Sequence, residues 1–166
     1  LRSDHSAAGS ALMSTYFLDT SSLVKRYHQE SGTEMVDQLF EEPERKLIVS
    51  DISIIEFYSA IGSKVRTGEI EAKAFSNLRK LFSNDIAQGV YRIVQFGEDD
   101  KEEAAKLLIQ YAPRHSLKTL DAIQLAVMKS EGKEHISAII CADERFGQII
   151  ELEGFRVVNP TRVCGV

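Results

Sequence analysis

Hydrophobic positions along the 166-residue chain form two kinds of run, and the two kinds alternate. Short runs rich in β-branched and aromatic residues predict strands. These lie at residues 15–18, 46–49, 91–94, 138–141 and 156–158. Longer stretches with apolar residues at helical spacing predict helices between the strands. These lie at residues 21–27, 33–41, 52–66, 70–86, 99–112, 117–131 and 144–153.

Strands that alternate with helices predict an α/β fold. We expect a three-layer α/β/α sandwich with a mostly parallel central sheet. In such sheets ligands bind in the crevice beyond the carboxyl ends of the strands. The residues that directly follow each predicted strand are therefore the first candidates for a functional site.

Length and composition favour one domain. The chain is 43% hydrophobic, which is enough apolar mass for a core. We expect residues 13–166 to form a single domain and residues 1–12 to be a tag remnant or a disordered tail. No apolar stretch approaches the length of a membrane span. Two scattered cysteines, Cys141 and Cys164, cannot build a disulfide framework, so we expect a cytoplasmic protein.

The charge balance narrows the function classes. The chain has 20 basic and 25 acidic residues, a net charge of −5. This argues against a passive nucleic-acid binder, which usually carries a basic excess. It is compatible with an enzyme that holds a cation and contacts phosphate through that cation.

Acidic side chains follow two of the predicted strands. Asp19 comes directly after the first strand, and Asp143 follows the fourth after one residue. Glu56 lies early in the helix that leaves the second strand. Because a helix that leaves the carboxyl end of a strand starts at that edge, we expect all three acids near the same crevice.

A fourth acid interrupts an apolar helical stripe. Leu117 precedes Asp121 by four residues, and Leu125 and Met128 follow it by four and seven. These positions share one face of a helix. A buried carboxylate without a partner is strongly unfavourable, so this stripe predicts a cation or a hydrogen-bonding partner for Asp121.

Each acid has an ordinary structural explanation. Asp19 and Asp143 could cap the helices that follow them, Glu56 could lie on a solvated face, and Asp121 could pair with Lys118. Four carboxylates at one sheet edge, however, would repel each other unless a cation neutralised them. Oxygen ligands without cysteine or histidine suit Mg²⁺ or Mn²⁺, which can clamp a phosphodiester and activate water.

Four segments occur in a specific order: YFLDTSSLVKRY, SDISIIEFYSA, LKTLDAIQLA and IICADERF. Together they resemble the motifs of the PIN domain and, within it, the VapC-type toxins of bacterial toxin–antitoxin pairs. The resemblance implies a PIN fold and an endoribonuclease that depends on Mg²⁺ or Mn²⁺. Asp19, Glu56 and Asp121 match the three core acidic positions, and Asp143 matches the fourth, more variable one.

The resemblance also implies supporting groups. Thr20 or Ser21 matches a small hydroxyl position that supports the site, and Ser53 is a weaker candidate. As a mechanism, we expect Asp19, Asp121 and Asp143 to hold one or two divalent ions. Glu56 would complete the metal site or orient the attacking water.

The implied partners are an RNA substrate, a VapB-like antitoxin and a second copy of the chain. Candidate phosphate contacts are Lys25, Arg26, Arg114 and Lys118. The apolar residues of 52–86 are shared between core packing and docking of the antitoxin or the second protomer, in proportions that the sequence leaves open.

Other functions stay open. The chain could be a PIN nuclease of RNA processing rather than a toxin, or a catalytically inactive PIN module that only binds. A phosphatase of the haloacid-dehalogenase class is disfavoured, because it needs a second acid where this chain has Ser21. A receiver domain is disfavoured because only Asp19 follows the first strand, where that fold has an acidic pair.

Overall fold

The structure, a computed structural model, describes residues 13–162. The predicted tail at residues 1–12 and the last four residues of the predicted domain lie outside this range. The described strands are β1 (Thr15–Leu18), β2 (Lys46–Ser50), β3 (Arg92–Val94), β4 (Ala138–Ile140) and β5 (Val157–Val158). They form one sheet in the order β3-β2-β1-β4-β5, and every neighbouring pair is parallel.

The helices follow the predicted order. They are α1 (Thr20–Leu23), α2 (Thr33–Glu41), α3 (Asp51–Arg66), α4 (Ala72–Ala87), α5 (Glu98–Tyr111), α6 (Thr119–Glu131) and α7 (Glu144–Leu152). Two short 3₁₀ helices, η1 (Val24–Arg26) and η2 (Lys133–His135), complete the described elements. The helix predicted at 21–27 is thus a short α1 continued by η1. No helix in the described range is long and apolar enough to cross a membrane.

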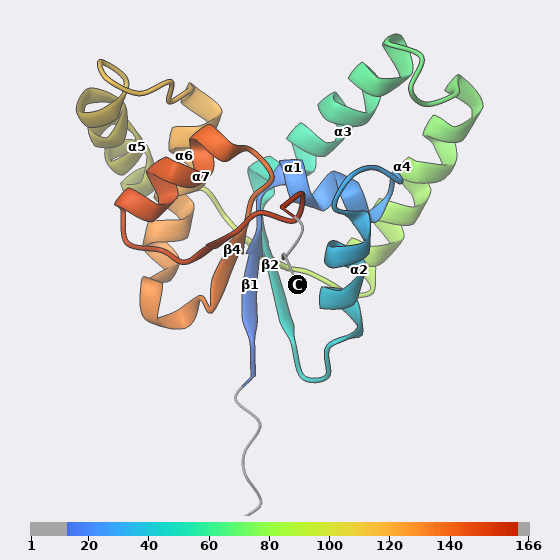
Figure 1. The fold of residues 1–166 in the computed structure, drawn as a ribbon, viewed down its shortest axis with the longest axis horizontal. Coiled ribbons are helices and arrows are strands. Elements are labelled where there is room, and N and C mark those ends of the chain that lie inside the picture. Colours follow the sequence, from blue (N-terminus) through green and yellow to red (C-terminus); the bar gives the residue numbers. More distant parts are fainter. Residues whose placement is uncertain (1–12, 163–166) are drawn as a thin grey trace, which may run out of the picture.

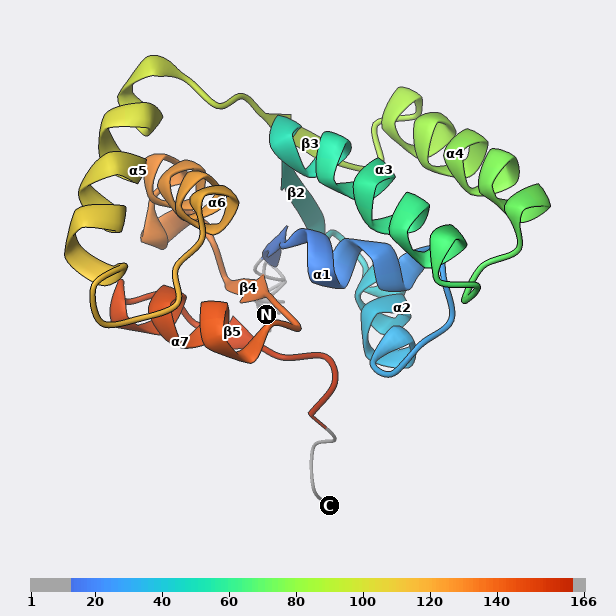
Figure 2. The ribbon, with the colours of Figure 1, turned by 90° about the horizontal axis from the view of Figure 1, so that it is seen from above.

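Alternating side chains of the strands separate two hydrophobic cores. On β1, Phe17 packs with residues of α5, α6 and α7, whereas Leu18 packs with residues of α1, α3 and α4. Ile139 and Ile140 of β4 divide in the same way. The views in Figures 1 and 2 agree, with α5–α7 on one side of the sheet and α1–α4 on the other. The predicted three-layer α/β/α sandwich is confirmed.

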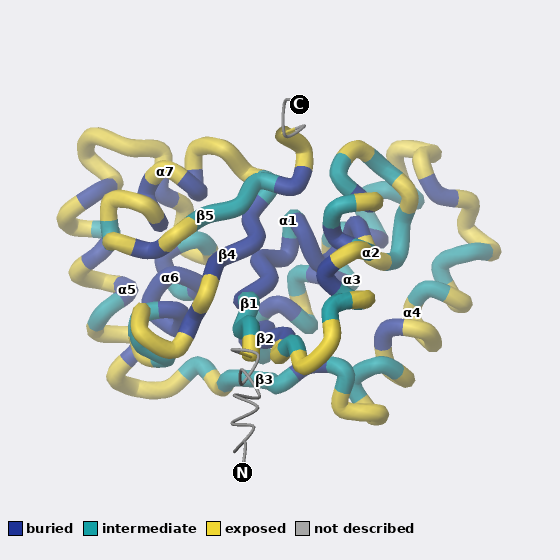
Figure 3. Tube along the Cα trace, turned by 60° about the horizontal axis from the view of Figure 1, so that its bottom comes forward, coloured by how far each residue is buried: buried dark blue, intermediate teal, exposed yellow. Residues whose placement is uncertain are grey.

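Helix α4 places one aromatic side chain fully in the core, and its other apolar residues there are only partly buried. Phe82 is its one fully buried residue, and the Phe82 ring lies 4.0 Å, between centroids, from that of Phe57 on α3. The hydroxyl of Tyr27 donates a hydrogen bond of 2.6 Å to Asp85 Oδ2 and adds a polar anchor. Most of α4 is otherwise exposed or only partly buried (Figure 3). The α3–α4 pair therefore projects from the body with a largely uncovered face (Figure 1).

The strand order creates a crevice at the carboxyl edge. From β1 the chain moves outward through β2 to β3, then returns to the other side of β1 to form β4 and β5. Ligands bind at such reversals in open α/β sheets. The residues that cap α1, α3 and α7 at this edge are Asp19, Ser50 and Asp143.

Candidate active site

Asp19 lies at the centre of the carboxyl edge. Its backbone N–H continues the β1–β4 pairing by donating to the carbonyl of Ile140 at 3.0 Å. Its side chain caps α1, because Oδ2 accepts hydrogen bonds from the backbone N–H of Ser21 at 3.1 Å and from the Ser21 hydroxyl. The residue is only 7% exposed. The cap explains the backbone geometry but leaves a buried carboxylate without a cationic partner among its hydrogen bonds.

The acidity of Asp19 reflects this position. Its pKa is raised to about 6: burial raises it most, the Ser21 hydrogen bonds lower it, and the charges of Glu56 and Asp121 add to the increase. The pKa of Asp121 is also raised, first by burial and then by the charges of Asp143 and Glu56. The structure therefore brings the four predicted acids into one electrostatic environment.

Glu56 is fixed through one of its two oxygens. Its Oε2 accepts hydrogen bonds from the Thr20 hydroxyl at 2.9 Å and from Gln124 Nε2 at 2.6 Å. Thr20 belongs to α1, Glu56 to α3 and Gln124 to α6, so this single oxygen joins three helices. Oε1 of Glu56 has no hydrogen-bond donor among the described residues.

Gln124 is a site residue that the sequence reasoning missed. It is 1% exposed, and its Nε2 also donates to the Ser53 hydroxyl at 2.9 Å. Its Oε1 accepts from the Ser50 hydroxyl at 2.7 Å, and Ser50 caps α3 by accepting from the backbone N–H of Ser53. Its signal in the sequence was a polar residue three positions after Asp121 within the apolar stripe. Ser53 therefore belongs to the network that orients Glu56.

Asp121 and Asp143 are held by backbone amides. Asp121 Oδ2 accepts from the N–H of Lys118 at 3.3 Å. Asp143 is exposed and caps α7, with Oδ1 accepting from the N–H of Arg145 at 2.9 Å and of Phe146 at 3.0 Å. Both acids line one hollow of about 360 Å³. The capping explanation for Asp143 and its place at the shared edge are thus both correct.

The donor chemistry of these acids fits a hard divalent cation. Carboxylate and hydroxyl oxygens surround the crevice, and the acids raise rather than lower each other's pKa. As the side chains stand, no three aspartate, glutamate, histidine or cysteine residues within 13–162 are grouped closely enough to hold a metal ion. The metal ligands therefore stay a prediction.

Cys141 is not placed for nucleophilic chemistry. Its thiol is buried and lies 3.7 Å from Asp19 Oδ2. Burial and then the charge of Asp19 raise the pKa of the Cys141 thiol well above its usual range. A thiol that stays protonated is a poor nucleophile.

The four predicted phosphate contacts divide into two groups. Lys25 Nζ lies 2.6 Å from Glu30 Oε1, and Arg26 Nη1 lies 2.7 Å from Asp37 Oδ1. Arg114 and Lys118 are exposed and make no ion pair within the described part of the chain. The role of all four in RNA binding stays a prediction.

The sequence profile of the PIN domain matches residues 16–152. This chain belongs to the PIN domain family. The matched range includes all four acids together with Thr20, Ser21 and Ser53.

Several solved structures share the fold of this chain. VapC20 of Mycobacterium tuberculosis, a toxin that cleaves the sarcin–ricin loop, aligns with a TM-score of 0.64 and 20% identity over 87% of this chain and 99% of its own. FitAcB of Neisseria gonorrhoeae aligns with a TM-score of 0.59 and 15% identity over 89% of this chain and 99% of its own. The DNA-bound VapBC of Salmonella typhimurium aligns with a TM-score of 0.59 and 12% identity over 89% of this chain and 99% of its own. A search of curated protein sequences found no match.

The position of Asp19 predicts an unusual pH dependence for the metal-free PIN domain. An aspartate titrates near 3.8 in the unfolded chain, whereas burial raises the folded pKa to about 6. The folded state therefore binds this proton more tightly, and its stability falls as pH rises through that window. Ionisation of Asp19 lowers the free energy of unfolding by about 3 kcal/mol at most. Urea unfolding in EDTA across this range measures it.

Asp19→Asn should remove most of that loss, because the amide cannot ionise. The matched control is Asp99→Asn, which changes an exposed aspartate on α5 and should keep the wild-type pH dependence. Equal pH dependence in wild type and Asp19→Asn would contradict the assignment of a destabilised carboxylate at the end of β1.

Gln124→Met tests whether Gln124 positions Glu56. Methionine fills a similar volume but cannot donate to Glu56 Oε2 or accept from Ser50. We expect Mn²⁺ affinity, measured by isothermal titration calorimetry, to fall about 10–100-fold. Gln110→Met, on the exposed face of α5, is the control and should bind as wild type does. An unchanged affinity in folded Gln124→Met would show that Glu56 does not need this support.

Proposed function

We propose that this PIN domain is a divalent-metal-dependent endoribonuclease that hydrolyses RNA phosphodiester bonds. The observation that carries the proposal is the convergence of Asp19, Glu56, Asp121 and Asp143 on one sheet edge. Membership of the PIN family supports a nuclease, and the acidic crevice supports hydrolysis with Mg²⁺ or Mn²⁺.

Asp19, Asp121 and Asp143 would hold the cation, and Glu56 would complete the site. When bound, Mg²⁺ or Mn²⁺ would stabilise charge on the phosphate and lower the pKa of the attacking water. The protein itself fixes the orientation of these carboxylates. Ser21 fixes Asp19 Oδ2, while Thr20 and Gln124 fix Glu56 Oε2. Glu56 Oε1, which has no hydrogen-bond donor among the described residues, would bind the cation or accept a proton from water.

We further propose that the enzyme is the toxin of a toxin–antitoxin pair and acts on cytoplasmic RNA. Support comes from the fold, which matches the toxin–antitoxin complex from Klebsiella pneumoniae at a TM-score of 0.57 and 19% identity. A toxin needs a surface that an antitoxin can cover. The uncovered face of α3 and α4 offers one.

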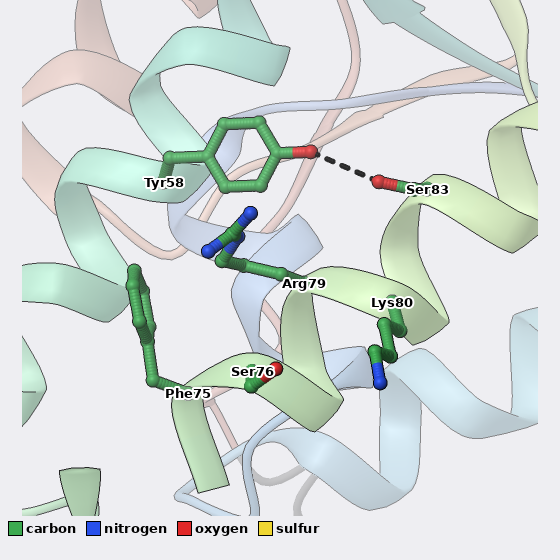
Figure 4. A pocket seen from close by; sticks show the side chains of 6 residues that line it. All are labelled: Tyr58, Phe75, Ser76, Arg79, Lys80 and Ser83. Carbon is green, nitrogen blue, oxygen red and sulfur yellow. Dashed lines mark hydrogen bonds between the residues drawn. The ribbon is translucent and has the colours of Figure 1, made fainter. Parts of the chain in front are cut away.

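The hollow between α3 and α4 has about 630 Å³ and combines aromatic and basic side chains (Figure 4). Its lining comprises Tyr58, Phe75, Ser76, Arg79, Lys80 and Ser83. No acidic residue of the range 13–162 lines it, which favours a partner segment with acidic and apolar residues. Nearby exposed side chains, Ile55 at 68% and Leu81 at 55%, would suit the same partner or the second copy of a homodimer.

A cleavage assay tests the enzymatic proposal. Purified protein, free of any antitoxin, is incubated with total RNA and with transfer RNA in Mg²⁺, Mn²⁺ or EDTA. We expect discrete cuts with either metal and none in EDTA. Asp19→Asn should lower the rate by about a hundredfold or more, because it removes a central carboxylate and loss of even a supporting group at a metal site costs about 10–100-fold in activity; Asp99→Asn should cut like wild type.

Two results would contradict the proposal. Cuts that persist in EDTA or in Asp19→Asn would point to a contaminating nuclease or to a different mechanism. Folded protein that neither cuts RNA nor binds Mn²⁺ would favour an inactive binding module.

The partner proposal is tested in cells. Expression of the chain should arrest growth, and co-expression of the small reading frame beside its gene should restore it. Arg79→Asp reverses a charge in the α3–α4 hollow and should weaken this rescue without slowing RNA cleavage. Lys106→Asp, on the exposed side of α5, is the matched control. Rescue that is equal in both variants would place the antitoxin elsewhere.

A further inference from the structure

Two hollows of about equal size meet at Asp143. One, of about 360 Å³, lies beside α1 and α3 and is lined by Thr20, Ser21, Lys25 and Lys64 among others. The other, also of about 360 Å³, lies between α6 and α7. A strand of nucleic acid that crosses the acidic edge would pass from one hollow to the other, so the cations in each decide where its phosphates are held.

The cations of the first hollow are already neutralised. Lys25 and Lys64 both bind Glu30, at 2.6 and 2.7 Å, and Lys64 also lies 3.0 Å from Glu69. The Lys25 side chain is only 7% exposed. A phosphate would have to displace Glu30 to reach these ammonium groups. They therefore join η1 to α3 rather than offer a free positive charge.

The cations of the second hollow are free to bind. Lys118 and Arg145 line it, are exposed, and form no ion pair with any residue in 13–162. Glu144 also lines this hollow, but its carboxylate is paired with Arg162. The second hollow thus combines two unpaired cations with Asp121 and Asp143.

The same turns position the cations and the acids. The backbone N–H of Lys118 donates to Asp121, and that of Arg145 donates to Asp143. Each carboxylate is therefore held by the residue that carries the neighbouring cation. This arrangement keeps both positive charges within a few residues of the acidic edge, although the chain as a whole has a net charge of −5.

We propose that Lys118 and Arg145 together bind the backbone phosphate next to the cleaved bond and make the α6–α7 hollow the side on which the RNA strand is gripped. This inference rests on the proposed nuclease function. It assigns a role to Arg145, and it favours Lys118 over Lys25 and Arg26 among the predicted phosphate contacts. Arginine and lysine are the side chains that bind phosphate most strongly.

The test compares Lys118→Gln, Arg145→Gln and the double variant with wild type. The matched controls are Lys46→Gln, at the opposite end of β2, and Arg66→Gln, at the end of α3. Binding of a short fluorescein-labelled single-stranded RNA is measured in the Asp19→Asn background at several salt concentrations. Cleavage of the same RNA by otherwise wild-type protein gives KM and kcat.

We expect each site variant to weaken binding about tenfold at low salt, because each removes one charge-assisted hydrogen bond to phosphate. The slope of log affinity against log salt should fall by about 0.7 for each lost contact. KM should rise with little change in kcat. The control variants should leave the slope and KM unchanged.

The outcomes separate the inference from the function on which it rests. If wild type cuts RNA and the double variant keeps its KM and salt slope, the inference is wrong and the nuclease stands. If the double variant changes Mn²⁺ affinity and kcat but not the salt slope, the two cations only balance the acids, and the inference is again wrong. If wild type neither binds nor cuts RNA, the proposed function fails and the inference with it.

Discussion

A carboxylate held almost out of solvent at the end of the central strand is the constraint on which the site depends. β1 lies between β2 and β4, so Asp19 cannot turn to water without breaking the cap of α1 and its contacts with the crevice. The hydrogen bonds from Ser21 lower its pKa, but burial and the neighbouring acids outweigh them. The ionised form of Asp19 is therefore unfavourable where it lies, and a bound cation would stabilise it. The rest of the edge brings three further acids near Asp19, and no lysine or arginine in 13–162 forms an ion pair with it.

Helix α3 connects this edge with the uncovered surface of the molecule. Three successive residues point to three environments: Glu56 to the acidic crevice, Phe57 to the core, and Tyr58 to the α3–α4 hollow. Phe57 also stacks on Phe82, which holds α4 in place. A partner bound between α3 and α4 would thus rest on the same helix turn that carries Glu56.

The parts of the site that could be predicted from the sequence depend on local rules. Asp19 and Asp143 became candidates because an acid at or just after the end of a buried strand lies at the carboxyl edge of the sheet, and Asp121 because it interrupts a helical stripe. The fold class was predicted from short strand-like hydrophobic runs that alternate with longer stretches of helical spacing. Gln124 could not be found in this way, because its role depends on Ser50 and Glu56, which are distant in sequence. Helix ends differed from the predictions by a few residues where short 3₁₀ turns or caps replace regular helix.

The predicted phosphate contacts also depend on tertiary contacts that the local sequence does not reveal. Lys25 and Lys118 look alike in the sequence, since each is a lysine a few residues from a candidate acid. The fold separates them, because the loop before α2 places Glu30 in an ion pair with Lys25, whereas Lys118 forms no ion pair with any residue in 13–162, although its charge acts on the neighbouring Asp121. A charge is available to a ligand only when no protein group has already neutralised it. Among the described residues, Lys118 and Arg145 combine an unpaired charge with a place beside the carboxylates, so under the proposed function they would set the direction from which a polyanion approaches.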